Sequence, residues 1–283
     1  MKRLSKPNYD FASAFIACTS NILDDDERNE FTAITADIAT SADDYVGRAI
    51  AGTTWMIPSL PRGGDPVVFG NIRSSHLKHL YEYYMVKRPE GRKIYDAIMV
   101  SAAGSCPMCG GIGRPRTLDH YLPKARYPAF SVLPHNLVPA CRDCNTDKGN
   151  PVAEKAEDQL IHPYFDKQCF FDEAWIVATV ARTPPYLITF EARPSLTWED
   201  LDRRRAIHHF GFFNVAEIYS IRAADEMSVL VDQRRNFMLE LNPQEFRAQL
   251  QSIGETETLF PNHWRKVMYR GLAQDDWFCS AIL

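Results

Sequence analysis

The residues CPMCGGIGRPRTLDHYLPKARYPAFSVLPHNLVPACRDCNTDKG, from Cys106 to Gly149, decide the local fold of this chain. They begin with the Cys-x-x-Cys pair Cys106 and Cys109 and end just after a second pair, Cys141 and Cys144. Four thiolates satisfy a zinc ion tetrahedrally, and each spacing places two sulfurs on one tight turn. We therefore expect a structural zinc that ties down the ends of a loop rich in proline and glycine. Because four sulfurs leave no open coordination position, this zinc would have no catalytic role.

Cysteine usage and the N-terminal sequence favour a reducing compartment. The chain has seven cysteines, an odd number, and its first residues, MKRLSKPNYDFASAF, lack the continuous apolar stretch of a signal peptide. No apolar run approaches the length of a transmembrane helix. In a reducing compartment, paired Cys-x-x-Cys indicates zinc rather than disulfides. We therefore expect a cytoplasmic protein without a membrane partner, in which Cys18, Cys169 and Cys279 are small buried apolar side chains.

Length and composition allow one large domain or two small ones. The chain has 283 residues, of which 45% are hydrophobic and 12% aromatic, enough for a substantial core. We divide it into an N-terminal helical region (1–102), a core that contains the cysteine-rich segment (103–165), and a strand pair followed by a C-terminal helical region (166–283). The expected fold class is α+β, mostly helical, with a small zinc-bound centre embedded between helical flanks.

Periodicity and capping residues locate the expected elements. Helical spacing covers residues 8–50, with an acidic helix start at 24–27, and residues 74–102, with a break near 88–91. Residues 53–70 contain three prolines and three glycines and are expected as a loop. β-Branched and aromatic residues at 175–180 and 186–191 predict a strand pair. Helices return from residue 196 onward, one of them with Asn242 as its N-cap and Pro243 at its first position. A last helix is expected to open at 262–265.

An acid and an imidazole, Asp119 and His120, lie between the two cysteine pairs. Residues 117–124 have the pattern of a strand that runs into a turn, residues 136–141 that of a second extended segment, and residues 145–149 that of a helix start. Neighbouring side chains on a strand point to opposite faces. Asp119 and His120 can therefore meet one phosphate only where the strand bends or has ended.

These residues resemble the HNH endonuclease family. The shared motif is Cys-x-x-Cys, then Asp-His-x-x-Pro, then Asn-Leu-x-x-x-Cys-x-x-Cys-Asn-x-x-Lys-Gly, and it spans residues 106–149. The resemblance implies a ββα-metal fold, two strands and a helix around one divalent cation. It also implies that His120 is the general base, that Asn136 braces the loop that holds this histidine, and that Asp119 is a carboxylate ligand. Asn145 falls where many members carry histidine, and its amide oxygen would ligate the cation.

The chemistry of these side chains suits phosphodiester hydrolysis. Oxygen ligands from Asp119 and Asn145 are those that Mg²⁺ or Mn²⁺ prefers. An imidazole can remove a proton from the attacking water near neutral pH. Simpler roles stay open for several residues: His120 as a core histidine, Asn136 as a turn residue and Asn145 as a helix N-cap. His135 could line the site, whereas His162 is favoured as a packing residue at the exit of the core.

Charge around the segment is opposite in sign to that of the whole chain. A net charge of −4 and a pI near 6.1 do not indicate a nucleic-acid binder, but residues 106–149 hold six basic residues against three acidic ones. Localised positive charge beside a phosphate site is what backbone binding requires. The candidate nucleic-acid contacts are Arg114, Arg116, Lys124, Arg126 and Lys148.

The leading expectation is a metal-dependent HNH endonuclease with a structural zinc and a catalytic Mg²⁺ or Mn²⁺, acting on DNA in preference to RNA. A narrower resemblance, to the HNH effectors of Septu and retron systems, implies a role in antiphage defence beside a regulatory ATPase or another defence protein. The alternative is a non-catalytic, zinc-stabilised subunit that binds nucleic acid or a partner. The C-terminal aromatic residues, expected to form a core or a protein interface, are Phe210, Phe212, Phe213, Trp264, Tyr269, Trp277 and Phe278.

Overall fold

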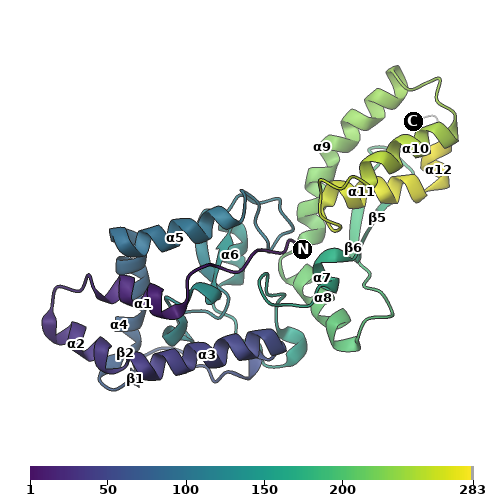
Figure 1. Cartoon of the computed structure of the whole chain (residues 1–283). Coiled ribbons are helices and arrows are strands. Elements are labelled where there is room, and N and C mark those ends of the chain that lie inside the picture. Colours follow the sequence, from purple (N-terminus) through teal and green to yellow (C-terminus); the bar gives the residue numbers. More distant parts are fainter. Residues whose placement is uncertain (282–283) are drawn as a thin grey trace. The chain divides into compact units, whose positions relative to one another are not determined.

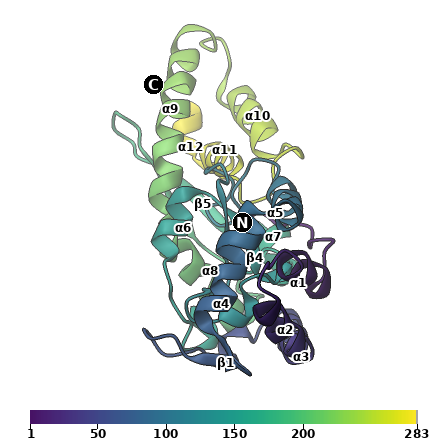
Figure 2. The ribbon, with the colours of Figure 1, turned by 90° about the vertical axis from the view of Figure 1, so that its left-hand side faces the viewer.

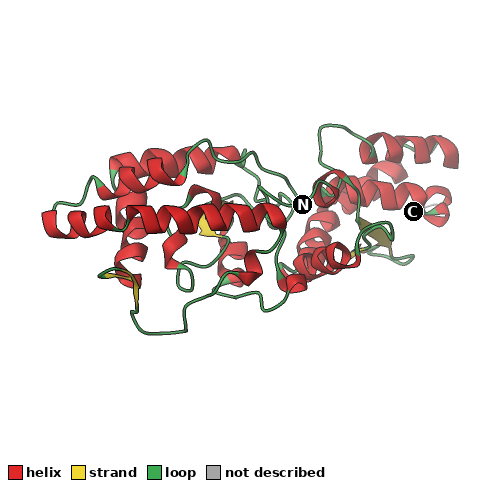
Figure 3. Ribbon diagram, turned by 60° about the horizontal axis from the view of Figure 1, so that its bottom comes forward, coloured by secondary structure: helices red, strands yellow, loops and turns green. Residues whose placement is uncertain are grey.

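The computed structural model describes residues 1–281, in which helices dominate and the strands form short antiparallel pairs (Figures 1 and 3). The expected α+β, mostly helical class is confirmed. None of the described helices is both long and apolar enough to cross a membrane. Contacts divide the chain into two bodies. The first consists of Arg3–Pro107 and Gly113–Asp166, and the second of Met1–Lys2, Met108–Ile112 and the chain from Lys167 onward.

Helices make up most of the first body. Its helical elements before the cysteine-rich segment are α1 (Phe11–Thr19), α2 (Asp25–Ala33), α3 (Thr35–Ala51), the short η1 (Thr54–Met56), α4 (Ser74–His79), the π-helix η2 (Leu80–Met85) and α5 (Pro89–Ser101). The acidic start is confirmed, because the Asp24 side chain caps α2 by accepting a hydrogen bond from the Glu27 N–H. The predicted break is confirmed as well: Arg88 precedes α5, whose first residue is Pro89.

The segment expected as a loop at 53–70 contains more structure than its composition suggests. Besides η1, it contains strand β1 (Val67–Phe69), which pairs with β2 (Ile72–Arg73). The turn between these strands passes through Gly70, whose φ of 51° favours glycine. The prediction of a plain loop was therefore wrong at its end, where the glycine closes a hairpin rather than ending ordered structure.

A strand pair and a helix lie at the centre of the cysteine-rich segment. Strand β3 (Thr117–His120) pairs antiparallel with β4 (Leu137–Ala140), and α6 (Arg142–Lys148) follows directly. Between the strands lie the short helices η3 (Pro128–Phe130) and η4 (Pro134–Asn136), and η5 (Ala156–Asp158) follows α6. Two helical tyrosines satisfy the outer edge of β3: the Tyr81 hydroxyl donates to the Leu118 carbonyl, and the Tyr95 hydroxyl accepts from the Leu118 N–H. These bonds hold β3 on the helical core without a third strand.

The second body combines one strand pair with helices. Its elements are α7 (Cys169–Asp172), β5 (Ile176–Val180), β6 (Ile188–Ala192), α8 (Asp200–Phe212), α9 (Val215–Asn236), α10 (Pro243–Gly254), α11 (Trp264–Gln274) and α12 (Asp276–Ser280). Strands β5 and β6 confirm the predicted pair. The Asn242–Pro243 helix start is confirmed, with Asn242 and Glu245 forming a capping box.

Helices α10, α11 and α12 gather beside the long α9 (Figure 2). Helix α11 lies so close to β5 that a Cβ on Gly271 would stand 2.4 Å from the Ala178 carbonyl oxygen. Of the C-terminal aromatic residues, Phe210, Phe213, Tyr269 and Phe278 are buried. These four side chains therefore belong to the core of this body.

Candidate metal centre and candidate active site

The four cysteines of the two Cys-x-x-Cys pairs form one buried cluster. The sulfurs of Cys106, Cys109, Cys141 and Cys144 all lie within 4.8 Å of one another. Zinc bonds of about 2.3 Å would place tetrahedral sulfurs about 3.8 Å apart, so the group fits a metal ion such as zinc after a small contraction. The cluster follows from local structure, since Cys141 is the N-cap of α6 and Cys144 lies on its first turn.

An open cleft of about 320 Å³ lies beside β3 and α6. It brings together three of the predicted site residues, Asp119, His120 and Asn145. Strand β3 ends at His120, and at the end of a strand the alternation of side chains no longer keeps Asp119 and His120 on opposite faces, so both can line one cleft. The other residues that line the cleft are Tyr81, Thr117, Leu118, Pro123, Lys124, Gly149 and Asn150.

The ring of His120 is fixed by one hydrogen bond and one aromatic contact. Its Nε2 lies 2.9 Å from the Ser131 carbonyl oxygen, and the Tyr81 ring stands edge-on to it at 4.4 Å between centroids. Since a carbonyl only accepts, Nε2 carries the proton and Nδ1 keeps its lone pair in the neutral ring. Burial lowers the pKa of His120 to about 3, so the ring is neutral at pH 7.

Asp119 is buried against Lys148. The Lys148 ammonium lies 3.0 Å from Asp119 Oδ2 and donates a hydrogen bond of 2.6 Å to the His120 carbonyl. The contact between the Lys148 ammonium and Oδ2 is a buried ion pair. Burial raises the pKa of Asp119, and the charge of Lys148 opposes that rise.

Asn136 binds the backbone on both sides of the turn after β3. Its Oδ1 accepts from the Leu122 N–H at 2.7 Å, and its Nδ2 donates to the carbonyls of Leu122 and Phe130. The Asn136 carbonyl also accepts from the Tyr121 N–H. The side chain is completely buried, so these bonds replace water that cannot reach it. Asn136 is thus a bracing residue, and it does not line the cleft.

Asn145 lies within α6 rather than at its start. Cys141 is the N-cap, and the Asn145 N–H donates to the Cys141 carbonyl as an ordinary helical bond. The open alternative that Asn145 caps the helix is therefore wrong, and its half-buried side chain lines the cleft. The carboxylate of Asp119 and the amide of Asn145 supply oxygen donors of the kind that fit a hard cation such as Mg²⁺, and at Asp119 such an ion would share the carboxylate with the Lys148 ammonium.

The five basic candidates have different surroundings. Arg114 and Arg116 are exposed, Lys124 lines the cleft and pairs with Glu82, and Arg126 is half-buried. Lys148 differs from the expectation of a phosphate contact, because only 1% of its side chain is exposed and its charge faces Asp119. The ion pair with an acid at the cleft explains why a lysine is buried here.

The two histidines left open lie outside the cleft. His162 is buried among aromatic rings, with Tyr121 at 4.1 Å between centroids, and its Nε2 contacts the Tyr45 hydroxyl. His135 packs against Phe165. The favoured packing role of His162 thus agrees with its contacts, and neither residue lines the cleft.

Two cleft residues were not found from the sequence. Tyr81 comes from η2, far from the motif along the chain, and only the packing of η2 on β3 brings it to His120. Asn150 directly follows the Lys-Gly end of the motif and lies just after α6. That position next to the motif was the signal in the sequence that could have identified it as a cleft residue.

Comparison with known proteins places the chain in a family but names no chemistry. No family model and no solved structure matches it. It is 33% identical to the protein ea31 of Escherichia phage lambda, and the match covers all of both chains. At this identity and coverage, the chain belongs to the same family as the phage lambda protein ea31.

Proposed function

We propose that this protein is a metal-dependent endonuclease of the HNH type that hydrolyses phosphodiester bonds, with DNA favoured over RNA. The observation that carries the proposal is that Asp119, His120 and Asn145 line one open cleft at the end of β3 and the side of α6. The order strand, strand, helix supports the same assignment. In this proposal a zinc held by the four cysteines is structural.

His120 is assigned the role of general base. Its Nε2 proton is held by the Ser131 carbonyl, which leaves Nδ1 as the atom that accepts a proton from water. The low pKa of the buried ring makes it a weak base in the free protein. An anionic phosphate placed beside the ring favours the protonated form and raises that pKa toward the working range.

Asp119 and Asn145 are the residues that would hold a divalent cation by oxygen. When bound, such an ion stabilises the negative charge that develops on the phosphate oxygens. Asn136 keeps the turn after β3 in place, and with it the ring of His120. The role in antiphage defence with an ATPase partner stays a prediction from resemblance.

The test is cleavage of supercoiled plasmid, single-stranded DNA and RNA by the purified full chain with Mg²⁺, Mn²⁺ or no added ion. We expect metal-dependent cleavage that falls by about 10²- to 10⁴-fold in His120→Ala, since general-base catalysis contributes that much. His135→Ala is the matched control, because this half-buried histidine comes from the same segment but lies outside the cleft.

Two results would sink the proposal. One is a wild-type protein that leaves every substrate intact, alone and with any co-encoded partner. The other is a His120→Ala variant that cleaves as fast as the wild type. Metal-independent binding without cleavage would favour the alternative, a zinc-stabilised binding subunit.

A further inference from the structure

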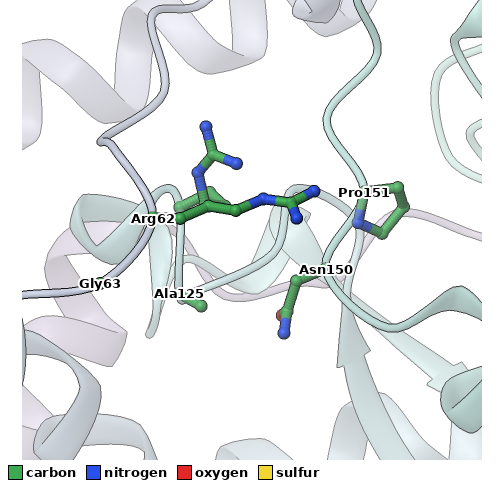
Figure 4. A pocket seen from close by; sticks show the side chains of 6 residues that line it. Arg62, Gly63, Ala125, Asn150 and Pro151 are labelled. Atoms are coloured by element: carbon green, nitrogen blue, oxygen red, sulfur yellow. The ribbon is translucent and has the colours of Figure 1, made fainter.

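A second pocket adjoins the Asp119–His120 cleft in the first body. It has a volume of about 510 Å³ and is lined by Arg62, Gly63, Ala125, Arg126, Asn150 and Pro151 (Figure 4). Asn150 lines both cavities, and Lys124 of the cleft is followed directly in the chain by Ala125 and Arg126 of the pocket. The two cavities therefore meet at Asn150.

The pocket carries positive charge that no acid in residues 1–281 pairs with. Arg62 is exposed and forms no hydrogen bond or ion pair with another residue of the described chain, 1–281. Among the described residues, Arg126 donates to two neutral acceptors, the Leu60 carbonyl and the Ser59 hydroxyl. None of the residues that line the pocket is acidic. Two guanidinium groups without a carboxylate partner make the pocket an anion site by charge.

The loop that carries Arg62 is anchored at its base. The Leu60 N–H donates to the Arg126 carbonyl at 2.9 Å, and Arg126 Nε donates to the Leu60 carbonyl at 2.6 Å. Asp65, the acid on this loop, is engaged by both the N–H and the hydroxyl of Ser75. Its carboxylate therefore stays with Ser75, and the loop presents Arg62 from a fixed base.

The loop tip leaves room for a ligand backbone. Gly63 has a φ of +78°, and a Cβ built there would have no neighbour within 4 Å. A phosphodiester can thus approach the loop closely next to Arg62. Guanidinium groups bind phosphate oxygens through parallel N–H bonds, which lysine cannot reproduce.

We infer that this pocket binds a backbone phosphate that neighbours the one in the Asp119–His120 cleft, so that the bound strand passes over Asn150. The inference rests on the proposed function, because it takes the ligand of the cleft to be a nucleic acid. Contacts of this kind set the position of the strand and carry no base sequence.

The test is the affinity of Arg62→Ala for a short fluorescein-labelled DNA strand and for its duplex, measured by fluorescence anisotropy over a range of salt concentrations. All proteins carry His120→Ala so that no substrate is consumed. We expect Kd to rise about tenfold, as for the loss of a charge-assisted hydrogen bond. The slope of log Kd against log salt should fall by about one. Arg62→Lys should recover the salt slope but only part of the affinity.

The matched control is Arg92→Ala, which removes the same charge from an exposed ion pair with Asp96 on α5 and lines neither cavity. Arg126→Ala is unsuitable, since it would release the base of the loop. Thermal melting checks that Arg62→Ala is folded, which is expected for an exposed side chain without partners in the described chain.

The outcomes separate this inference from the proposed function. If Arg62→Ala and its parent share one Kd and one salt slope, the inference fails, whether or not the wild type cleaves. If binding depends on Arg62 but the wild type cleaves nothing, the pocket stands and the nuclease proposal fails. A parent protein that binds no nucleic acid overturns the inference.

Discussion

The cysteine cluster and the Asp119–His120 cleft come from one short segment but differ in how complete their sets of donor atoms are. Four buried sulfurs within 4.8 Å surround the position of a metal on all sides. The cleft offers only an oxygen-rich wall and about 320 Å³ of open space. A complete set stabilises a fold and leaves nothing for a substrate, whereas an incomplete set can bind one. Changes in the first should therefore remove the fold, and changes in the second should spare it.

The largest effect is expected from Cys106→Ser. Structural zinc contributes about 10 kcal/mol or more in small modules, which is comparable to the whole stability of a domain. We expect a variant that is metal-free and unfolded or insoluble, as judged by metal content from mass spectrometry and by thermal melting. Cys169→Ser is the control, because this cysteine is half-buried and outside the cluster. A soluble Cys106→Ser protein without metal and with the wild-type melting curve would contradict the structural role of the cluster.

Much of the difference between the cysteine cluster and the Asp119–His120 cleft was predictable, because it depends on residues that are close together in the sequence. Each Cys-x-x-Cys spacing, the strand before His120 and the helix after Cys141 depend on residues within a few positions of one another. The capped start of α10 at Asn242 and the strand pair β5–β6 are local in the same sense. The hairpin β1–β2 was missed because proline and glycine indicate a turn but do not show which flanking residues pair across it.

The parts that could not be predicted depend on contacts between distant residues. Lys148 was expected to be a nucleic-acid contact because it lies in a segment of local positive charge. Its burial follows from an ion pair with Asp119, 29 positions earlier in the chain. Arg62 and Tyr81 reach the two cavities only through the packing of η2 and of the loop after η1. The hydrophobic periodicity of the sequence does not show which distant residues will come into contact.

Lys148→Met sharpens the comparison between the cysteine cluster and the cleft, because it tests whether residues at the cleft also stabilise the fold. Removing one partner of a buried ion pair costs about 3–5 kcal/mol, since the other charge stays buried alone. We expect a loss of that size at neutral pH in urea denaturation, reduced in the double variant Lys148→Met/Asp119→Asn, which carries no buried charge. The loss should also shrink on acidification, because protonated Asp119 no longer needs a counter-charge. An equal loss in the single and double variants would show that the ion pair is not the cause.

A smaller loss is expected from Asn136→Ala. The change leaves the Leu122 N–H and the carbonyls of Leu122 and Phe130 without their partner in a buried turn. The expected cost is about 2–3 kcal/mol in the free energy of unfolding. Asn71→Ala is the control, since its side chain is exposed and donates only to Glu30. A stability equal to that of the control would show that the turn after β3 does not depend on Asn136.

The smallest effect concerns the two buried histidines, one in each body. Burial lowers the pKa of both His120 and His209 to about 3, and the Nε2 atom of His209 donates to the Met108 carbonyl. In the unfolded chain both would titrate near 6.5. Between these values the unfolded state binds more protons, so stability is present above pH 6.5 and is lost as the pH falls toward 3.

The free energy of unfolding should therefore fall by about 1.4 kcal/mol for each histidine when the pH is lowered from 7.5 to 5.5. In His209→Asn, the loss of stability between the two pH values should be smaller by the contribution of one histidine, whatever the change does to stability at pH 7.5. The measurement is urea denaturation at the two pH values for the wild type, His209→Asn and the control His79→Asn, which changes an exposed histidine at the end of α4. If His209→Asn keeps the full pH dependence, His209 is not neutral in the folded state. Because His209 has no place in the cleft, its titration changes stability alone, whereas that of His120 would change stability and cleavage together.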